Sequence, residues 1–412
     1  MTTSPSLRRA VTAKIAFGLV LVLCIAAPTQ SFAQTFTGIF SFDGTNGANP
    51  YGTLALGSDG NFYGTSQFGG AGGQGTVFKI TPGGAQTVLY NFCAGTPQCD
   101  SNGDQPFAGL IQGTDGIFYG GTLGAVFSIT TSGDLSTLYT FCSLPECADG
   151  IGLYDALVQG TDGNFYGATE GGGAVSTYEC EGGCGTVFKI TPGGTLTTLY
   201  SFHGTDGYQP NGGLVQWTDG NFYGTTRNGG AHQSGTVFKI TPTGALTLLH
   251  SFTGADGYSP NGALTLGTDG NFYGTTQVGG QFNGGAIFKI TPSGTFTLLR
   301  SFNSSNGGGY GPFAGLVQAS DGNFYGAAFY GGTGVANCPL LYMCGTIFRF
   351  TPAGKLTTIY NFCAESGCPE GGGPFGALVQ GAGGSLYGST VLGGSTGNGT
   401  VFEVSIGSHQ KR

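Results

Sequence analysis

Charged side chains are scarce in this chain of 412 residues, at 8% against roughly 25% in an average soluble protein. The few lysines and arginines exclude nucleic acid as a partner, because phosphate backbones are bound by dense basic patches. The 84 glycines argue against a helical bundle. Disorder is opposed by 39% hydrophobic residues, including 32 Phe and 19 Tyr, which can form a large core.

The familiar motifs of enzymes are also missing. The sequence contains no nucleophile elbow, phosphate-binding loop, zinc-protease helix or dinucleotide fingerprint. The many glycine pairs are not phosphate cradles, because no helix is expected after them. We therefore expect no cofactor and lean towards a protein that is not an enzyme.

The N-terminus reads as a secretory signal peptide over residues 1–33. Three basic residues precede a short apolar run, Ile15–Ala27, and Ser31-Phe32-Ala33 places small residues at the positions that signal peptidase prefers. Cleavage is expected before Gln34. A retained membrane anchor and a lipoprotein attached through Cys24 are the alternatives, although Leu23 is too large for a lipobox.

The predicted signal peptide determines the expected location of the protein and the charge of the mature chain. Three of the 13 basic residues and none of the 21 acidic residues lie in 1–33, so residues 34–412 are strongly acidic. We expect a secreted or extracellular protein, or one of the cell envelope, including the periplasm. After signal cleavage no transmembrane anchor is expected, and the protein is predicted to be a monomer.

Ten cysteines follow the signal peptide and fall into five close pairs, which predict disulfides in an exported chain. Metal binding is the alternative, but no pair has the two-residue spacing of zinc knuckles and histidines are few. The predicted disulfides are Cys93–Cys99, Cys142–Cys147, Cys180–Cys184, Cys338–Cys344 and Cys363–Cys368.

A phrase of six residues recurs seven times and predicts the architecture. The first copy is Asp59–Gly64 (DGNFYG), and a degenerate copy runs from Gly383 to Gly388. The copies between them begin at Asp115, Asp162, Asp219, Asp269 and Asp321, at intervals of 47 to 62 residues. The Asp-Gly pairs are interpreted as turn formers, not calcium ligands, because single carboxylates do not form the oxygen cluster that calcium needs.

Each repeat divides into four short strands, a to d. In the fourth repeat they are predicted at 213–216, 221–226, 236–241 and 246–252, with tight turns at 218–220 and 242–244. Four antiparallel strands repeated seven times predict an all-β fold, a single seven-bladed β-propeller over residues 34–412. A β-solenoid is the structural alternative, although its coils are usually shorter.

The last repeat has no strand d of its own, and the segment Thr35–Phe42 matches the strand d phrase of the other repeats. We therefore predict that this N-terminal strand completes the seventh blade and removes an open sheet edge.

The motif order, with Asp162–Gly167 followed by Gly185–Gly194, resembles the GloVer-type tandem repeat of bacterial exported proteins, across nearly the whole mature chain. The a–turn–b pattern also resembles NHL-type propeller repeats. The NHL resemblance implies that strand a lines the central channel and that strand d lies outside. Neither family implies catalytic residues.

If strand a is innermost, the d–a and b–c loops share one face, here called the long-loop face. Titratable side chains concentrate there and form a candidate ligand face, consisting of Glu170, Glu179, Glu181, His203, Asp206, Arg227 and His232. Carboxylates beside histidine can serve acid–base chemistry or bind a metal. The alternative is that these residues have no shared function, because long surface loops are generally rich in polar residues.

The tyrosines of the repeated phrase, from Tyr63 to Tyr387, are predicted to pack between blades, with a sugar-binding ring as the alternative.

The sequence therefore favours a secreted or cell-surface, non-catalytic binding scaffold whose ligand is a polysaccharide or a protein. The first alternative is an extracellular polysaccharide-degrading hydrolase or lyase that uses the long-loop face. The second is a passive structural protein of the envelope. Fold alone does not choose among them.

Overall fold

The computed structural model describes residues 1–2, 34–94, 103–174, 180–306, 308–338 and 342–406. The chain divides into two compact units, Met1–Ala33 and Gln34–Arg412, and the second contains all the described strands. Residues 3–33 of the predicted signal peptide, together with Cys99 and Glu179, lie outside the described residues. Among the residues that are described, no helix has the length and apolar character needed to cross a membrane.

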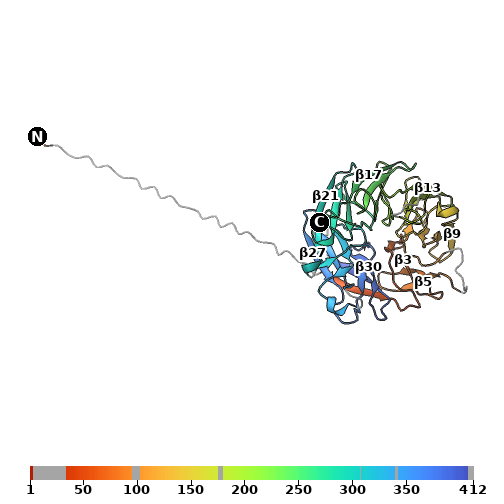
Figure 1. Cartoon of the computed structure of the whole chain (residues 1–412). Helices are drawn as coiled ribbons and strands as arrows, with labels where there is room; N and C mark the ends of the chain where they lie inside the picture. The colour runs from red at the N-terminus through yellow and green to blue at the C-terminus, as the bar shows by residue number, and fades with distance from the viewer. Residues whose placement is uncertain (3–33, 95–102, 175–179, 307, 339–341, 407–412) are drawn as a thin grey trace. The chain divides into compact units, whose positions relative to one another are not determined.

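The second unit is a seven-bladed β-propeller of antiparallel sheets, as predicted (Figure 1). The first three blades are β2 (Ala55–Leu56), β3 (Phe62–Ser66), β4 (Thr76–Ile80) and β5 (Gln86–Asn91); β6 (Ile111–Gln112), β7 (Phe118–Gly121), β8 (Ala125–Ile129) and β9 (Leu135–Thr140); and β10 (Val158–Gln159), β11 (Phe165–Thr169), β12 (Thr186–Ile190) and β13 (Leu196–Ser201). The next three are β14 (Val215–Gln216), β15 (Phe222–Thr226), β16 (Thr236–Ile240) and β17 (Leu246–Ser251); β18 (Thr265–Leu266), β19 (Phe272–Thr276), β20 (Asn283–Ile290) and β21 (Phe296–Asn303); and β23 (Val317–Gln318), β24 (Phe324–Ala328), β26 (Thr346–Phe350) and β27 (Leu356–Asn361).

The seventh blade is shared between the two ends of the propeller. It contains β29 (Val379–Gln380), β30 (Leu386–Leu392) and β31 (Thr400–Ser405), and its outer strand is β1 (Thr35–Ser41). β1 pairs antiparallel with β31, from Thr35 opposite Ser405 to Ser41 opposite Thr400. The predicted closure by the N-terminal strand is therefore confirmed.

The repeated phrase forms the turn between strands a and b. In the first blade the Asp59 carboxylate accepts hydrogen bonds from the Asn61 backbone and side chain and from the Tyr63 hydroxyl. Gly60 has a φ of +78°, which a side chain would disfavour. The carboxylate is thus used inside the turn, in line with the interpretation of Asp-Gly as a turn former.

The tyrosine of the phrase packs between blades, as predicted. Tyr63 is fully buried, and its ring stacks on Phe118 of the next blade with centroids 4.0 Å apart. The same tyrosine–phenylalanine contact recurs at the other blade boundaries, except that Tyr325 of the sixth blade packs in one cluster with Leu386 of the seventh. It also joins the last blade to the first, because the ring centroid of Tyr387 lies 4.2 Å from that of Phe62. These tyrosines therefore do not form an exposed sugar-binding ring.

The d–a and b–c loops lie together, as the long-loop face requires. In the fourth blade Tyr208 of the d–a loop forms a β-bridge with Asn228 of the b–c loop. In the sixth blade the equivalent contact extends to the strand pair β22 (Gly309–Tyr310) and β25 (Tyr330–Gly331). β28 (Gly372–Pro374) pairs likewise with β30 in the seventh. Three 3-10 turns complete the described loops, at Pro145–Cys147, Ser304–Asn306 and Val335–Asn337.

Disulfides fasten these loops. The structure contains four of the five predicted pairs, Cys142–Cys147, Cys180–Cys184, Cys338–Cys344 and Cys363–Cys368. The predicted partner of Cys93, Cys99, lies outside the described residues.

Candidate functional site

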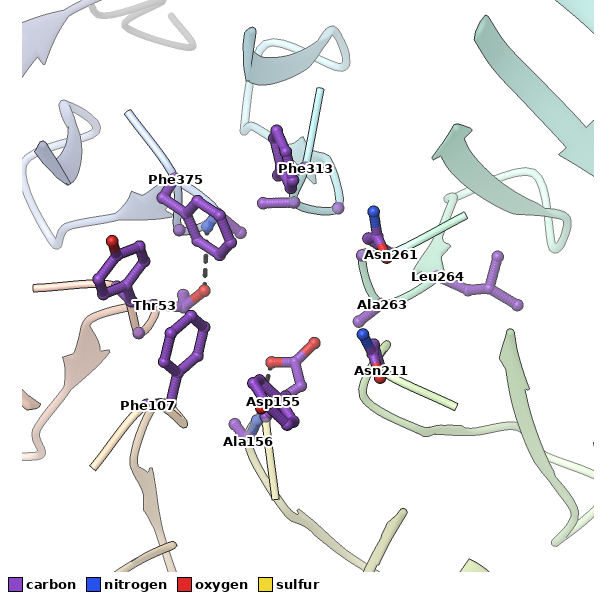
Figure 2. Close-up of a pocket in the computed structure, with 18 of the residues that line it drawn as sticks. Thr53, Phe107, Asp155, Ala156, Asn211, Asn261, Ala263, Leu264, Phe313 and Phe375 are labelled. Atoms are coloured by element: carbon purple, nitrogen blue, oxygen red, sulfur yellow. Dashed lines mark hydrogen bonds between the residues drawn. The ribbon is translucent and has the colours of Figure 1, made fainter. Parts of the chain in front are cut away.

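A cavity of about 450 Å³ lies where the seven d–a loops enter the innermost strands, and we call it the central cavity (Figure 2). One equivalent residue from every blade lines it, three positions before a buried leucine that leads into strand a. These seven residues are Tyr51, Phe107, Tyr154, Asn211, Asn261, Phe313 and Phe375. The volume falls within the range of small-molecule sites, roughly 300–1,000 Å³.

Five of the seven equivalent residues are aromatic and form a continuous series, called here the aromatic arc, in the order Tyr154, Phe107, Tyr51, Phe375 and Phe313. Neighbouring ring centroids along it lie 5.0, 4.4, 4.9 and 4.9 Å apart. All five side chains are only partly buried, although the aromatic residues of the blade cores are almost fully buried. The arc therefore offers an apolar wall to the cavity and is not an extension of the core.

The wall opposite the arc is polar (Figure 2). It carries Asn211 and Asn261, which stand at the aromatic position in the fourth and fifth blades. Asn261 Nδ2 donates to Gln277 Oε1 at 2.9 Å, which fixes the orientation of that amide. The side-chain oxygen of Asn211 is buried and has no hydrogen-bond partner in the described structure. A buried acceptor without a donor is costly, so a ligand that donates to it would be favoured.

Asp155 adds a carboxylate to this polar wall (Figure 2). The other six blades have glycine or alanine at its position, namely Gly52, Ala108, Gly212, Gly262, Ala314 and Gly376. Its two oxygens accept backbone N–H groups from Ala156 and, across the blade boundary, from Gly213, each at 2.7 Å. Burial raises the pKa of Asp155, and these two hydrogen bonds oppose the rise without cancelling it.

This raised pKa leads to a pH-dependent prediction for Asp155→Ala. In the window above the unfolded-state pKa of about 3.9, the folded protein holds this proton more tightly than the unfolded chain does. The free energy of unfolding of the wild-type protein therefore decreases as the pH rises from the unfolded-state pKa through the raised pKa of Asp155. We expect urea titrations to show the variant gaining stability relative to wild type between pH 4 and pH 8.

Asp59→Ala is the matched control for that measurement. Burial raises the pKa of Asp59, but the hydrogen bonds from Asn61 and Tyr63 outweigh this effect and leave the pKa lowered. The stabilisation by ionised Asp59 is complete above about pH 3.9 and is lost only in acid. The difference in free energy of unfolding between wild type and Asp59→Ala should therefore stay constant from pH 5 to pH 8. An Asp155→Ala difference that is equally flat with pH would contradict the prediction.

Two residues of the predicted ligand face, Glu170 and Arg227, line the same cavity. Burial, followed by the charge of Glu170 and a hydrogen bond to it, raises the pKa of Tyr154 to about 12. Arg227 forms no ion pair within the described part of the chain, where the only two ion pairs join a histidine to an aspartate. The cavity therefore combines two carboxyl groups with one guanidinium group.

The other described residues of the predicted face lie outside the central cavity. Glu181 is exposed in a second depression that Glu170 also borders. Asp206 accepts from the His203 backbone at 2.8 Å and from the Tyr200 hydroxyl, while His203 Nδ1 lies 3.4 Å from its carboxylate. Asp256 holds the next d–a loop in the same way, so Asp206 fastens a loop. His232 is exposed, and Glu179 lies outside the described residues.

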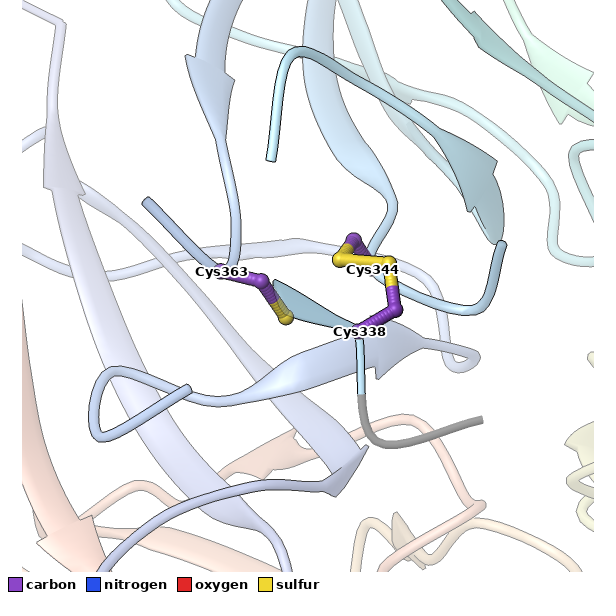
Figure 3. Close-up of side chains that lie close together, drawn as sticks. All are labelled: Cys338, Cys344 and Cys363. Atoms are coloured by element: carbon purple, nitrogen blue, oxygen red, sulfur yellow. A yellow bond between two sulfur atoms is a disulfide. The ribbon is translucent and has the colours of Figure 1, made fainter. Parts of the chain in front are cut away.

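One cluster of cysteines has the spacing of a metal site. Sulfur atoms of Cys338, Cys344 and Cys363 lie within 4.8 Å of one another (Figure 3). Cys338 is bonded to Cys344, and Cys363 is bonded to Cys368. Metal ligation needs free thiolates, so these sulfurs fasten loops in the oxidised protein.

Comparisons with known proteins agree with this architecture. A family model described as the Gloeobacter/Verrucomicrobia repeat matches residues 121–338. No curated protein matches the chain.

Among solved structures, a streptogramin B lyase is similar at 16% identity and a TM-score of 0.59, covering 90% of this chain and 97% of that chain. Extracellular domains of two B. thetaiotaomicron proteins described as hybrid two component systems are similar at 10% and 14% identity, with TM-scores of 0.57 and 0.55. Each match covers 89% of this chain, which spans about two fifths of the length of those chains, 39% and 41%. At these identities the likeness establishes the fold alone.

Proposed function

This chain belongs to the Gloeobacter/Verrucomicrobia repeat family, and we propose that it is a non-catalytic binding protein of the cell exterior whose ligand enters the central cavity. The ligand is a small molecule or the end of a larger polymer, because the cavity has a volume of about 450 Å³. The long-loop face around the cavity serves as the approach to it.

One observation carries this proposal, namely the departure of the central cavity from the pattern of the repeat. A purely structural ring would be expected to place similar side chains at one repeat position. Here five blades provide aromatic rings and two provide asparagines, and the carboxylate of Asp155 replaces a glycine or alanine. A mostly apolar pocket with a few converging polar groups is the usual form of a ligand site.

The proposed location outside the cytoplasm is supported by the cysteines. Four disulfides are present in the described residues, and such bonds persist mainly in oxidising compartments. The expected signal peptide points the same way.

The proposal is tested by filling the cavity, which blocks any class of ligand. Ala263 lies between Asn261 and Leu264 on the cavity wall (Figure 2). We expect Ala263→Trp to lower retention on polysaccharides, envelope fractions and small-molecule panels at least tenfold, about 1.4 kcal/mol. The measurement is retention of purified protein on each material.

Leu248→Trp is the matched control, because Leu248 is exposed on β17, outside the cavity. It should leave retention unchanged. If Ala263→Trp fails to fold, Ala377→Phe fills the cavity from the seventh blade. Equal retention by folded cavity-filling variants and wild type would refute the site, and no retention on any material would favour a passive structural protein.

An enzyme acting on extracellular polysaccharide is the second candidate. The observation that favours it is the pair of carboxyl groups, Asp155 and Glu170, in one cavity, with the pKa of Asp155 raised. Glycosidases use two carboxyl groups of unequal pKa as acid and base. Release of reducing ends during the retention assay, lost in Asp155→Ala, would establish catalysis in place of binding alone.

A further inference from the structure

We infer that the ligand of the central cavity is a neutral sugar, taken as a short oligosaccharide or the end of a longer glycan. This inference rests on the proposed function, because it names the ligand class of the same site. It follows from the two unlike walls of the cavity, the aromatic arc and the polar wall that faces it.

The polar wall indicates which groups the ligand carries. The asparagine amides both donate and accept hydrogen bonds, whereas the carboxylate of Asp155 only accepts when ionised. A hydroxyl group also donates and accepts, so it is matched by such a mixture. Asn211 Oδ1, which is buried without a donor, would be satisfied by a ligand hydroxyl.

The aromatic arc indicates the shape of the ligand. Phe313 stacks on Phe375 with an interplanar angle of 29°, and Tyr51 stacks on Phe107 at 18°. The two stacked pairs meet edge to face at Tyr51 and Phe375, with an angle of 84°. An apolar wall of this width buries the C–H face of a pyranose, while the hydroxyls at the ring edge reach the polar wall.

Other ligand classes fit the walls less well. A wholly apolar ligand would leave the side-chain oxygen of Asn211 without a donor, which costs roughly 1–3 kcal/mol. An acidic sugar would meet two carboxyl groups, Asp155 and Glu170, and only one guanidinium, Arg227. An organic cation needs acceptors alone, yet the cavity also contains the guanidinium of Arg227 and the amide donors of the asparagines.

Within this site Asp155 and Asn211 determine specificity, because they provide the acceptors on the wall opposite the arc. Asp155→Ala should leave the fold intact, since alanine stands at this position in the second and sixth blades as Ala108 and Ala314. Asp155→Ala also loses the hydrogen bond from the Gly213 backbone. Asn211→Leu provides an independent test, because the side-chain oxygen of Asn211 makes no described hydrogen bond that the substitution could break.

The test uses an array of neutral gluco-, manno-, xylo- and galacto-oligosaccharides, followed by calorimetric titration of the strongest binder. Uronic acid oligosaccharides and benzyltrimethylammonium are the competing probes. We expect a neutral oligosaccharide to bind and Phe375→Ala, Asn211→Leu and Asp155→Ala each to weaken it at least tenfold. Phe282→Ala removes an exposed aromatic side chain outside the cavity and should not change the affinity.

Two failures are distinguishable. If only an acidic sugar or the ammonium ion binds, and the cavity variants weaken that binding, the ligand class is wrong while the proposed function stands. If a neutral oligosaccharide binds equally well to wild type, Phe375→Ala and Asn211→Leu, both are wrong, because recognition then occurs elsewhere. Absence of binding to every neutral oligosaccharide also overturns the ligand class.

Discussion

Deletion of Thr35–Phe42 is expected to abolish cooperative folding of the propeller. This segment contacts three blades. β1 pairs with β31 of the seventh blade, Phe36 stacks on Tyr360 of the sixth at 3.8 Å, and the fully buried Phe42 packs against Phe78 of the first at 5.1 Å. Loss of a buried phenylalanine side chain alone costs about 3–5 kcal/mol. Whole domains are stable by only about 5–15 kcal/mol.

The measurement is thermal unfolding followed by circular dichroism and calorimetry. A permuted chain is the matched control, with the same segment attached after Ser405 through the sequence Pro-Gly-Gly, copied from residues 82–84. Because Thr35 lies opposite Ser405, this connection forms a c–d hairpin like those of the other blades. The permutant should recover the wild-type melting temperature. A deletion variant that melts like the wild type would show that β1 does not close the ring.

The second large effect is expected from a single methyl group at Gly262, which lies in the wall of the central cavity. A Cβ atom built at this glycine would overlap the backbone of Ala314 and Gly315 in the next blade. Backbone atoms cannot move aside without shifting the blade, so Gly262→Ala should destabilise the protein by about 1–3 kcal/mol. Chemical denaturation measures this difference directly.

Gly383→Ala is the control for that variant. Gly383 lies in the a–b turn of the seventh blade, and a Cβ atom built there meets no atom within 4 Å. Its stability should match the wild type or exceed it slightly, because alanine narrows the unfolded ensemble. Equal stability of Gly262→Ala and Gly383→Ala would disprove the close approach of the fifth and sixth blades.

The fold could be predicted from the sequence because the same turn and strand motifs are repeated in each of the seven blades. The Asp-Gly turn and the interblade tyrosine are set by short-range geometry, so one phrase, Asp59–Gly64, specifies both. The seventh repeat has no strand d, and an unassigned strand begins at Thr35, so the closure of the ring by the N-terminal strand could be predicted. Strand limits also agreed closely, for example Phe222–Thr226 for the predicted 221–226.

The site was predicted only in part. Glu170 and Arg227 line the central cavity, but a search for titratable residues also selected His203 and Asp206, whose hydrogen bonds fasten a loop. Which polar loop residues turn towards the axis depends on loop conformation, and a single sequence does not determine it.

The aromatic arc did leave a signal in the sequence. Aligning the repeats on the leucine that precedes strand a places an aromatic residue three positions earlier in five of them, as in Tyr51 and Leu54. The same alignment isolates Asp155 at a position of small residues. That these positions meet at the axis follows only from the closed ring.

The central claim is that the ligand lies in the central cavity at the axis of the ring. A crystal structure of the protein soaked with the tightest-binding oligosaccharide tests it most directly. The account predicts a sugar ring against Phe375 and Phe313, with a hydroxyl donating to the side-chain oxygen of Asn211. Well-defined sugar bound to the outer loops, with the cavity empty, would contradict it.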